Sequence, residues 1–148
     1  MTSTLSDIPY SHQSNKDNNR SFANLINDLK TKMELVFHDR GKIDQMESER
    51  GLPPFVLQEI MSVNPLSVCV RKEYGGLGAK THEVLQLLAT ASYESLALCL
   101  TFGINSALFL QPFDKYGLEE VKAPVFRRFI EEQTMGGLMI TEPSFGSD

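Results

Sequence analysis

A cluster of short hydrogen-bonding side chains lies at the end of the sequence. Thr141, Ser144 and Ser147 follow a short apolar run, and Gly146 adds a flexible position among them. Backbone N–H groups in a glycine-rich turn can bind an anion, and hydroxyls add directional hydrogen bonds to carbonyl or phosphate oxygens. An ordinary strand-ending turn has a similar composition, because Ser and Asp there bond their own backbone. Local chemistry alone favours the ordinary turn.

A second glycine-rich segment, Tyr74-Gly75-Gly76-Leu77-Gly78, lacks the spacing and context of a phosphate-binding loop or a dinucleotide fingerprint. Glycines in such turns more often supply positive φ than contact a ligand, so we expect a structural turn. His12, His38 and His82 have no second ligand at metal spacing. The sequence therefore predicts no metal site.

The two cysteines give no sign of catalysis or cross-linking. Cys69 and Cys99 are thirty positions apart, without a CxxC motif and without a His nearby in the sequence. This spacing predicts buried free thiols in a reducing compartment, rather than a disulfide or a zinc site. A GxSxG motif is also missing, and the acidic residues of the last predicted helix alternate with basic ones, as on a solvated surface.

Apolar residues at spacings of three and four predict most of the elements that would position these groups. One stripe begins after a plausible N-cap at Ser21 and ends near His38, and Pro53-Pro54 open a second, shorter helix. Leu118 to Gln133 forms the last helix. Together these patterns predict a helical domain.

The middle of the chain carries two further patterns. Leu66, Val68 and Val70 alternate with other residues, which predicts a short extended piece before the glycine turn. From about Thr81 the apolar positions go almost all the way round, which is typical of a core helix surrounded by others, and Gly103 is a candidate break or bend.

Composition sets broad limits on function. The 148 residues are 41% hydrophobic and carry a formal charge of −5, which fits a soluble globular domain and argues against nucleic acid as a partner. Residues 95–113 have no formal charge over nearly the length of a membrane span, but they contain Thr, Asn, Ser, Gln, Gly and Pro. We therefore expect a helix buried in a protein core and no membrane span.

The sequence divides into three parts. Residues 1–20 are polar and contain no apolar run for a signal peptide, so we expect a disordered tail and a cytoplasmic location. Residues 21–135 carry the helical patterns, and residues 136–148 contain a short apolar run followed by a turn. A lone strand would leave both of its edges unpaired. This predicts a helical domain followed by the first strand of a sheet that is missing.

Three segments, in this order, resemble the acyl-CoA dehydrogenase family. They are Glu73-Tyr74-Gly75-Gly76-Leu77-Gly78, then residues 117–122 opening a helix that leads to Gly136, then Thr141-Glu142-Pro143 with Gly146-Ser147-Asp148. The last of them is the most specific signature of the family. The chain departs from the family at Arg71-Lys72, where Pro-Glu is usual, and at Ser144-Phe145, where small residues are commoner.

The resemblance implies a mainly α fold: residues 21–135 would be the N-terminal helical domain of this family, and residues 136–148 would begin a β-barrel domain that is missing. In the family, FAD lies between the barrel and the helical domains. Carried over by motif, the cofactor-binding residues are Leu138, Met139, Ile140, Thr141 and Ser147. The resemblance implies that Thr141 bonds the flavin pyrimidine edge. Ser147 would bond the pyrophosphate and also lie near the acyl-CoA substrate.

The reaction that the resemblance implies is α,β-dehydrogenation of an acyl thioester, carried on coenzyme A or an acyl carrier. In the family a glutamate removes the α proton while hydride leaves the β carbon for the flavin. None of these 148 residues matches that base, so we expect no catalytic residue here and no activity from the chain alone. The family also implies a homo-oligomer for the full-length protein and an electron-accepting flavoprotein as partner.

Two other interpretations stay open. The chain could be a non-catalytic helical interaction module derived from such an enzyme, and an exposed apolar patch would favour this. It could also be an incomplete copy of a longer gene.

Overall fold

The computed structural model describes residues 21–40, 46, 48 and 50–137, and this part of the chain is mainly helical and has no strand. Its elements are α1 (Phe22–Glu34), the π-helical η1 (Leu35–Arg40), α3 (Pro54–Met61), the 3₁₀ turns η2 (Pro65–Cys69) and η3 (Lys72–Tyr74), α4 (Thr81–Glu94), α5 (Leu96–Gly103), the π-helical η4 (Ile104–Leu110), α6 (Gln111–Tyr116) and α7 (Glu119–Glu131). The predicted mainly α fold is confirmed. The tail over residues 1–20 and the strand from Leu138 lie outside the described residues.

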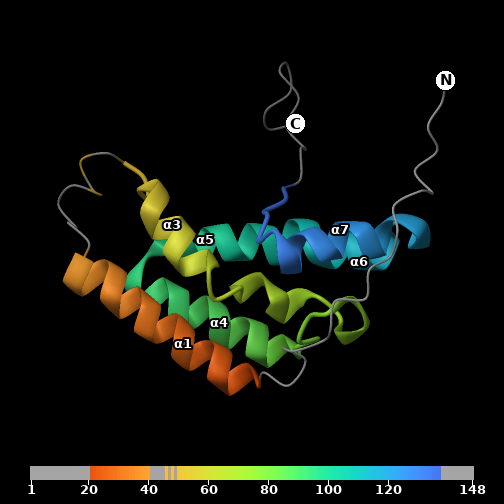
Figure 1. Ribbon diagram of the computed structural model, residues 1–148, viewed down its shortest axis with the longest axis horizontal. Coiled ribbons are helices and arrows are strands. Elements are labelled where there is room, and N and C mark those ends of the chain that lie inside the picture. Colours follow the sequence, from red (N-terminus) through yellow and green to blue (C-terminus); the bar gives the residue numbers. More distant parts are fainter. Residues whose placement is uncertain (1–20, 41–45, 47, 49, 138–148) are drawn as a thin grey trace, which may run out of the picture.

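The helices form two layers around a central 3₁₀ turn. Helices α1 and α4 lie side by side in one layer, and α5, α6 and α7 form the other (Figure 1). Between the layers η2 contacts α1, α4, α7 and η4. Its side chains Leu66 and Val68 are fully buried, so this short turn is the centre of the apolar core.

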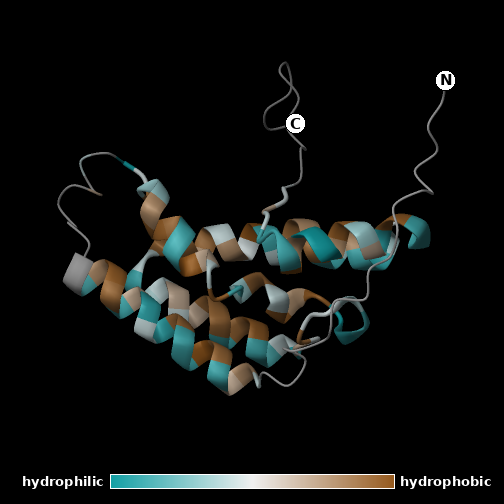
Figure 2. Ribbon diagram, in the orientation of Figure 1, coloured by the Kyte–Doolittle hydropathy of each residue, from teal (hydrophilic) through white to brown (hydrophobic). Residues whose placement is uncertain are grey.

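Helix α1 follows the predicted stripe. Its cap is the predicted one, because the Ser21 hydroxyl accepts a hydrogen bond from the N–H of Asn24 at 3.2 Å. Hydrophobic and hydrophilic residues alternate along α1 (Figure 2), and its buried residues are Leu25, Ile26, Leu29 and Met33. The prediction of helices opened by Ser21 and by Pro53-Pro54 is thus confirmed.

The extended piece predicted over Leu66, Val68 and Val70 is wrong. Residues 65–69 form a 3₁₀ turn, and only Val70 is extended. Asn64 stands before this turn in the left-handed region with φ 55°, and Pro65 begins the turn. The Ser67 hydroxyl donates to the Asn64 carbonyl at 2.6 Å, which holds the turn closed.

The long helix predicted from Thr81 is two helices, and the break is at Ser95 rather than at Gly103. Ser95 is extended, with φ −154° and ψ 118°, and its hydroxyl caps α5 by accepting from the N–H of Leu98 at 3.3 Å. Gly103 keeps right-handed helical angles, and the helix widens to a π-helix immediately after it.

The sequence pattern predicted a core helix surrounded by other helices, and this prediction is wrong. Residues Leu96–Tyr116 form one helical stretch that is long and apolar enough to cross a membrane, yet most of its residues are not buried in this chain. Leu98 and Phe102 are fully buried, whereas Leu96 and Leu100 on the opposite face are 68% and 55% exposed. One face therefore packs in the core and the other is bare.

The glycine turn folds back on η2 through its backbone. The N–H groups of Leu77, Gly78 and Ala79 donate to carbonyls of Ser67, Val70 and Val68 at 2.8, 2.8 and 3.0 Å. Those of Gly75 and Gly76 donate to carbonyls of residues 72 and 71 at 3.0 and 3.1 Å. Five successive amides are thus used within the protein and none of them is left for an anion, in agreement with the structural turn predicted from the sequence.

Gly76 has no space for a side chain. A Cβ on Gly76 would lie 2.0 Å from the Val70 carbonyl oxygen, which already accepts from Gly78. We predict that Gly76→Ala lowers the free energy of unfolding by roughly 3 kcal/mol, because the turn must move away from η2. Urea unfolding followed by circular dichroism measures this value.

Gly51→Ala is the matched control for that change, since a Cβ there meets nothing within 4 Å. We expect it to alter the free energy of unfolding by less than about 1 kcal/mol. Equal stability of the two variants would contradict the packing described for the glycine turn.

The predicted free thiols are also present. Cys69 and Cys99 are both free and partly buried. Burial raises the pKa of Cys69 to about 11, although a hydrogen bond with Ser106 acts in the opposite direction.

We predict that iodoacetamide at pH 8 alkylates Cys69 on the order of 100-fold more slowly in the folded chain than in urea. Peptide mass spectrometry measures both rates, and equal rates would contradict this burial.

Candidate functional site

The five residues predicted to bind the cofactor, Leu138, Met139, Ile140, Thr141 and Ser147, lie outside the described residues. The structure instead describes the segment that immediately precedes them, up to residue 137. The N–H of Gly136 donates to the Asn105 side-chain oxygen Oδ1 at 2.7 Å. A Cβ on Gly136 would lie 2.5 Å from the ring of Phe109, so the backbone packs directly on that ring. The segment is therefore anchored two residues before Leu138.

Asn105 supplies this anchor from inside the π-helical η4. Its side chain is buried, with the residue only 4% exposed, and its Nδ2 donates to the Thr101 carbonyl at 2.8 Å. The neighbouring Ser106 is also buried and donates to the Gly103 carbonyl at 3.2 Å. A π-helix rotates side chains out of the usual register and is frequent at functional sites. Sequence reasoning missed Asn105, whose only signal was a polar residue in an uncharged run.

Arg71, one of the two departures from the family pattern, ties the glycine turn to α6. Its Nε donates to Asp114 at 2.7 Å and its Nη1 contacts Glu73 at 2.6 Å. The guanidinium also lies 5.0 Å from the centroid of the Tyr74 ring, which stacks on Phe126 at 4.9 Å. Arg71 thus links the glycine turn to α6 and to the ring of Tyr74.

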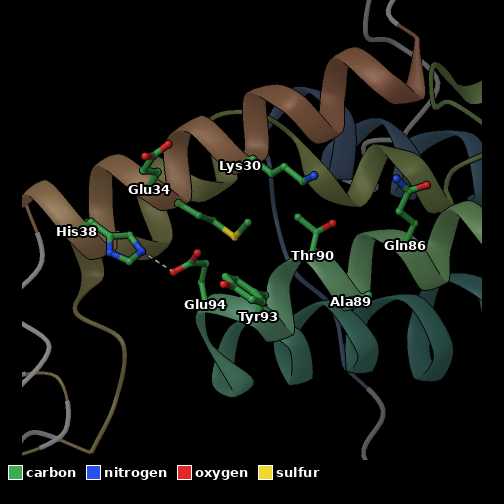
Figure 3. A pocket seen from close by; sticks show the side chains of 9 residues that line it. Lys30, Glu34, His38, Gln86, Ala89, Thr90, Tyr93 and Glu94 are labelled. Atoms are coloured by element: carbon green, nitrogen blue, oxygen red, sulfur yellow. Dashed lines mark hydrogen bonds and ion pairs between the residues drawn. The ribbon is translucent and has the colours of Figure 1, made fainter.

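A groove of about 740 Å³ runs between α1 and α4 (Figure 3). Met33 forms its floor, and Lys30, Glu34, Tyr93 and Glu94 are among its lining residues. Here His38, which the sequence left without a role, meets Glu94: the two side chains are 2.9 Å apart (Figure 3). Charges of both signs line the groove, so it selects no ligand class by charge.

Among residues 21–40, 46, 48 and 50–137, no three His, Cys, Asp or Glu side chains are placed to hold a metal.

The Asn105 anchor gives a direct test. We predict that Asn105→Ala lowers the free energy of unfolding by about 1–3 kcal/mol, because the partly buried N–H of Gly136 loses its acceptor. The amide of Gly136 should also exchange with solvent faster, which NMR hydrogen exchange measures. Asn24→Ala, at an exposed position of α1, is the matched control. Unchanged exchange at Gly136 in Asn105→Ala would contradict the anchor.

Comparison with known proteins relates this helical domain to a family of enzymes. The pattern of the family described as "Acyl-CoA dehydrogenase, N-terminal domain" matches residues 37–133, from the end of the first helix to just beyond α7. The very long-chain specific acyl-CoA dehydrogenase of Rattus norvegicus is 24% identical over 95% of this chain, and that of Macaca fascicularis is 23% identical over the same share. The isovaleryl-CoA dehydrogenase of Bos taurus is 27% identical over 72% of the chain.

The chain spans 21% of the length of the first two relatives and 25% of the third. No solved structure gives a significant match. The family match covers about two-thirds of the chain and coincides with the helices around η2, the glycine turn and α7. The chain therefore belongs to the acyl-CoA dehydrogenase family, and this helical unit is its N-terminal domain.

Proposed function

We propose that this chain supplies the N-terminal helical domain and the first flavin-binding residues of an FAD-dependent acyl-CoA dehydrogenase. The observation that carries the proposal is the family match over residues 37–133, which ends three residues before the anchored Gly136. The Thr141-Glu142-Pro143 and Gly146-Ser147-Asp148 signature follows directly. The substrate class would be an acyl thioester, and the electron acceptor another flavoprotein.

The residues after the anchor have the donor chemistry that a flavin needs. The hydroxyl of Thr141 would donate to the polar pyrimidine edge, and that of Ser147 to the pyrophosphate and near the acyl-CoA. Leu138, Met139 and Ile140 would lie along the cofactor. When bound, FAD supplies the acceptor for the hydride that leaves the substrate. The part played by this chain is to hold and orient, since the 148 residues contain no match to the family's base.

The proposal includes no activity for the 148 residues alone. Proton removal from the α carbon needs a positioned base, and hydride transfer needs an oriented flavin and acyl group. The match covers only 21% of the length of the very long-chain relative of Rattus norvegicus and 25% of the isovaleryl-CoA dehydrogenase. The base and much of the cofactor site would come from the regions of such a protein that these residues do not match.

A second candidate function, a non-catalytic helical interaction module, is favoured by one observation. Leu96 and Leu100, four positions apart and therefore on the same face of α5, are more than half exposed. Exposed large apolar side chains on one face are typical of an interaction site. In this function the same helical domain would bind another polypeptide and no flavin.

A chimera tests the flavin proposal. This chain replaces the matching N-terminal region of bovine isovaleryl-CoA dehydrogenase, and bound flavin is measured by its visible absorbance. We predict that the chimera binds FAD. Thr141→Ala/Ser147→Ala in the chimera should weaken flavin binding by about 10-fold or more, because two hydrogen bonds are lost. Ser62→Ala, at the exposed C-cap of α3 and far in sequence from Thr141 and Ser147, is the matched control.

The outcomes separate the two functions. A folded chimera that stays colourless, or one whose flavin affinity is unchanged by Thr141→Ala/Ser147→Ala, would contradict the proposed flavin contacts. Acyl-CoA turnover by the 148-residue chain with added FAD would contradict its predicted inactivity. A stable, colourless oligomer of the chain together with a colourless chimera would favour the interaction module.

A further inference from the structure

Two side chains of the π-helical η4, Asn105 and Phe109, hold the backbone of Gly136. The Asn105 oxygen Oδ1 accepts a hydrogen bond from the N–H of Gly136 at 2.7 Å. A Cβ on Gly136 would lie 2.5 to 2.7 Å from three ring carbons of Phe109, so the backbone lies directly against that ring. The hydrogen bond fixes the orientation of the peptide group, and the ring leaves no room for a side chain. Two independent contacts therefore fix one residue.

The acceptor atom of Asn105 is itself held in place. Asn105 is 4% exposed, and its Nδ2 donates to the Thr101 carbonyl at 2.8 Å, one turn earlier in the same helix. Because the amide nitrogen is bonded to a carbonyl, the amide oxygen is the atom that remains for an N–H donor. The hydrogen-bond acceptor for Gly136 is thus oriented by η4 itself.

The ring of Phe109 is held by two further helices. It stacks on Phe113 of α6 with the ring centroids 5.7 Å apart, and on Phe129 of α7 with the centroids 5.4 Å apart. Phe113 in turn meets the ring of Phe126 edge-on at 5.4 Å. Aromatic pairs at these distances attract each other beyond their apolar burial. The surface against which Gly136 lies is therefore part of the packed interior.

The held residue lies next to the predicted flavin-binding residues. Gly137 follows it, and a Cβ on Gly137 would meet nothing within 4 Å. Leu138, the first residue assigned to the cofactor, comes one position later. Two residues of extended chain span at most about 7 Å. The contacts at Gly136 therefore limit where the flavin-binding residues can begin.

We infer that Asn105 and Phe109 are positioning residues for flavin binding, which act by holding Gly136 and need not touch the flavin. This inference rests on the proposed function. A ligand that binds one arrangement of a chain loses affinity in proportion to the fraction of molecules that have this arrangement. Loss of the contacts at Gly136 lowers that fraction. Flavin association should then become slower, whereas flavin dissociation, which depends on the direct contacts, should change little.

Stopped-flow mixing of FAD with the flavin-free chimera tests this inference, because it measures association and dissociation separately. We expect Asn105→Ala and Gly136→Ala each to slow association by about 10-fold and to alter dissociation by less than about 2-fold. The double variant should be only slightly slower than either single variant, because both changes break the same contact. Gly137→Ala is the matched control, since its Cβ enters open space.

Three further variants separate positioning from other effects. Thr141→Ala/Ser147→Ala removes the proposed direct contacts and should accelerate dissociation. Val36→Ala shortens a fully buried side chain in η1 and should lower stability without slowing association. Phe109→Leu keeps an apolar side chain but removes the flat ring, so it should slow association even if Gly136→Ala fails to fold. Circular dichroism verifies the fold of each variant.

The outcomes distinguish this inference from the proposed function. A chimera that binds FAD at a rate unchanged by Asn105→Ala and Phe109→Leu would overturn the inference and leave the proposed function intact. Equal slowing by Gly137→Ala or Val36→Ala, or faster dissociation in Asn105→Ala, would also overturn it. A folded chimera that binds no FAD would contradict the proposed function and this inference together.

Discussion

The rest of the structure depends on one helical stretch, Leu96–Tyr116, whose two faces meet different surroundings. One face places Leu98, Phe102 and Leu110 in the core, where each buried side chain contributes about 1.5–3 kcal/mol of apolar burial. The other face is bare. Asn105, buried in the same stretch, anchors the chain at Gly136. The core, the exit of the chain and the exposed surface are therefore set by the same helix.

Much of the helical fold followed from apolar periodicity and from capping residues. Ser21 and the Pro53-Pro54 pair begin helices where the sequence predicted. Periodicity could not tell which apolar faces are covered, because a helix with apolar residues all round looks the same whether its cover lies in this chain or elsewhere. The alternation over residues 66–70 was also ambiguous, since a 3₁₀ turn opened by left-handed Asn64 and Pro65 buries Leu66, Val68 and Val70, as a strand with one buried face would.

The candidate site was predictable only in part. The glycine turn was correctly interpreted as structural, and its amides are all bonded to backbone carbonyls. Asn105 and Arg71 could not be assigned from the sequence, because their partners Gly136 and Asp114 are 31 and 43 positions away and only the tertiary fold brings them together. His38 meets Glu94 for the same reason, at a separation of 56 positions. The flavin contacts of Thr141 and Ser147 stay predictions from the family signature.

The two faces of this helix explain how the domain can have a closed core although part of its apolar surface is uncovered. Its core is closed around η2 by the turn at Gly76, while Leu96 and Leu100 are exposed on the opposite face of α5. This arrangement leaves an apolar face available for contact with a further surface. The buried face of Leu96–Tyr116 stabilises the domain, and its opposite face is exposed.

Carbene footprinting of the dilute, monomeric chain tests this two-faced helix most directly, because it reports the solvent contact of each side chain. We predict strong labelling of Leu96, Leu100 and Leu108 and protection of Leu98, Phe102 and Leu110. Equal labelling of the two sets, or protection of the first set in the monomer, would contradict it.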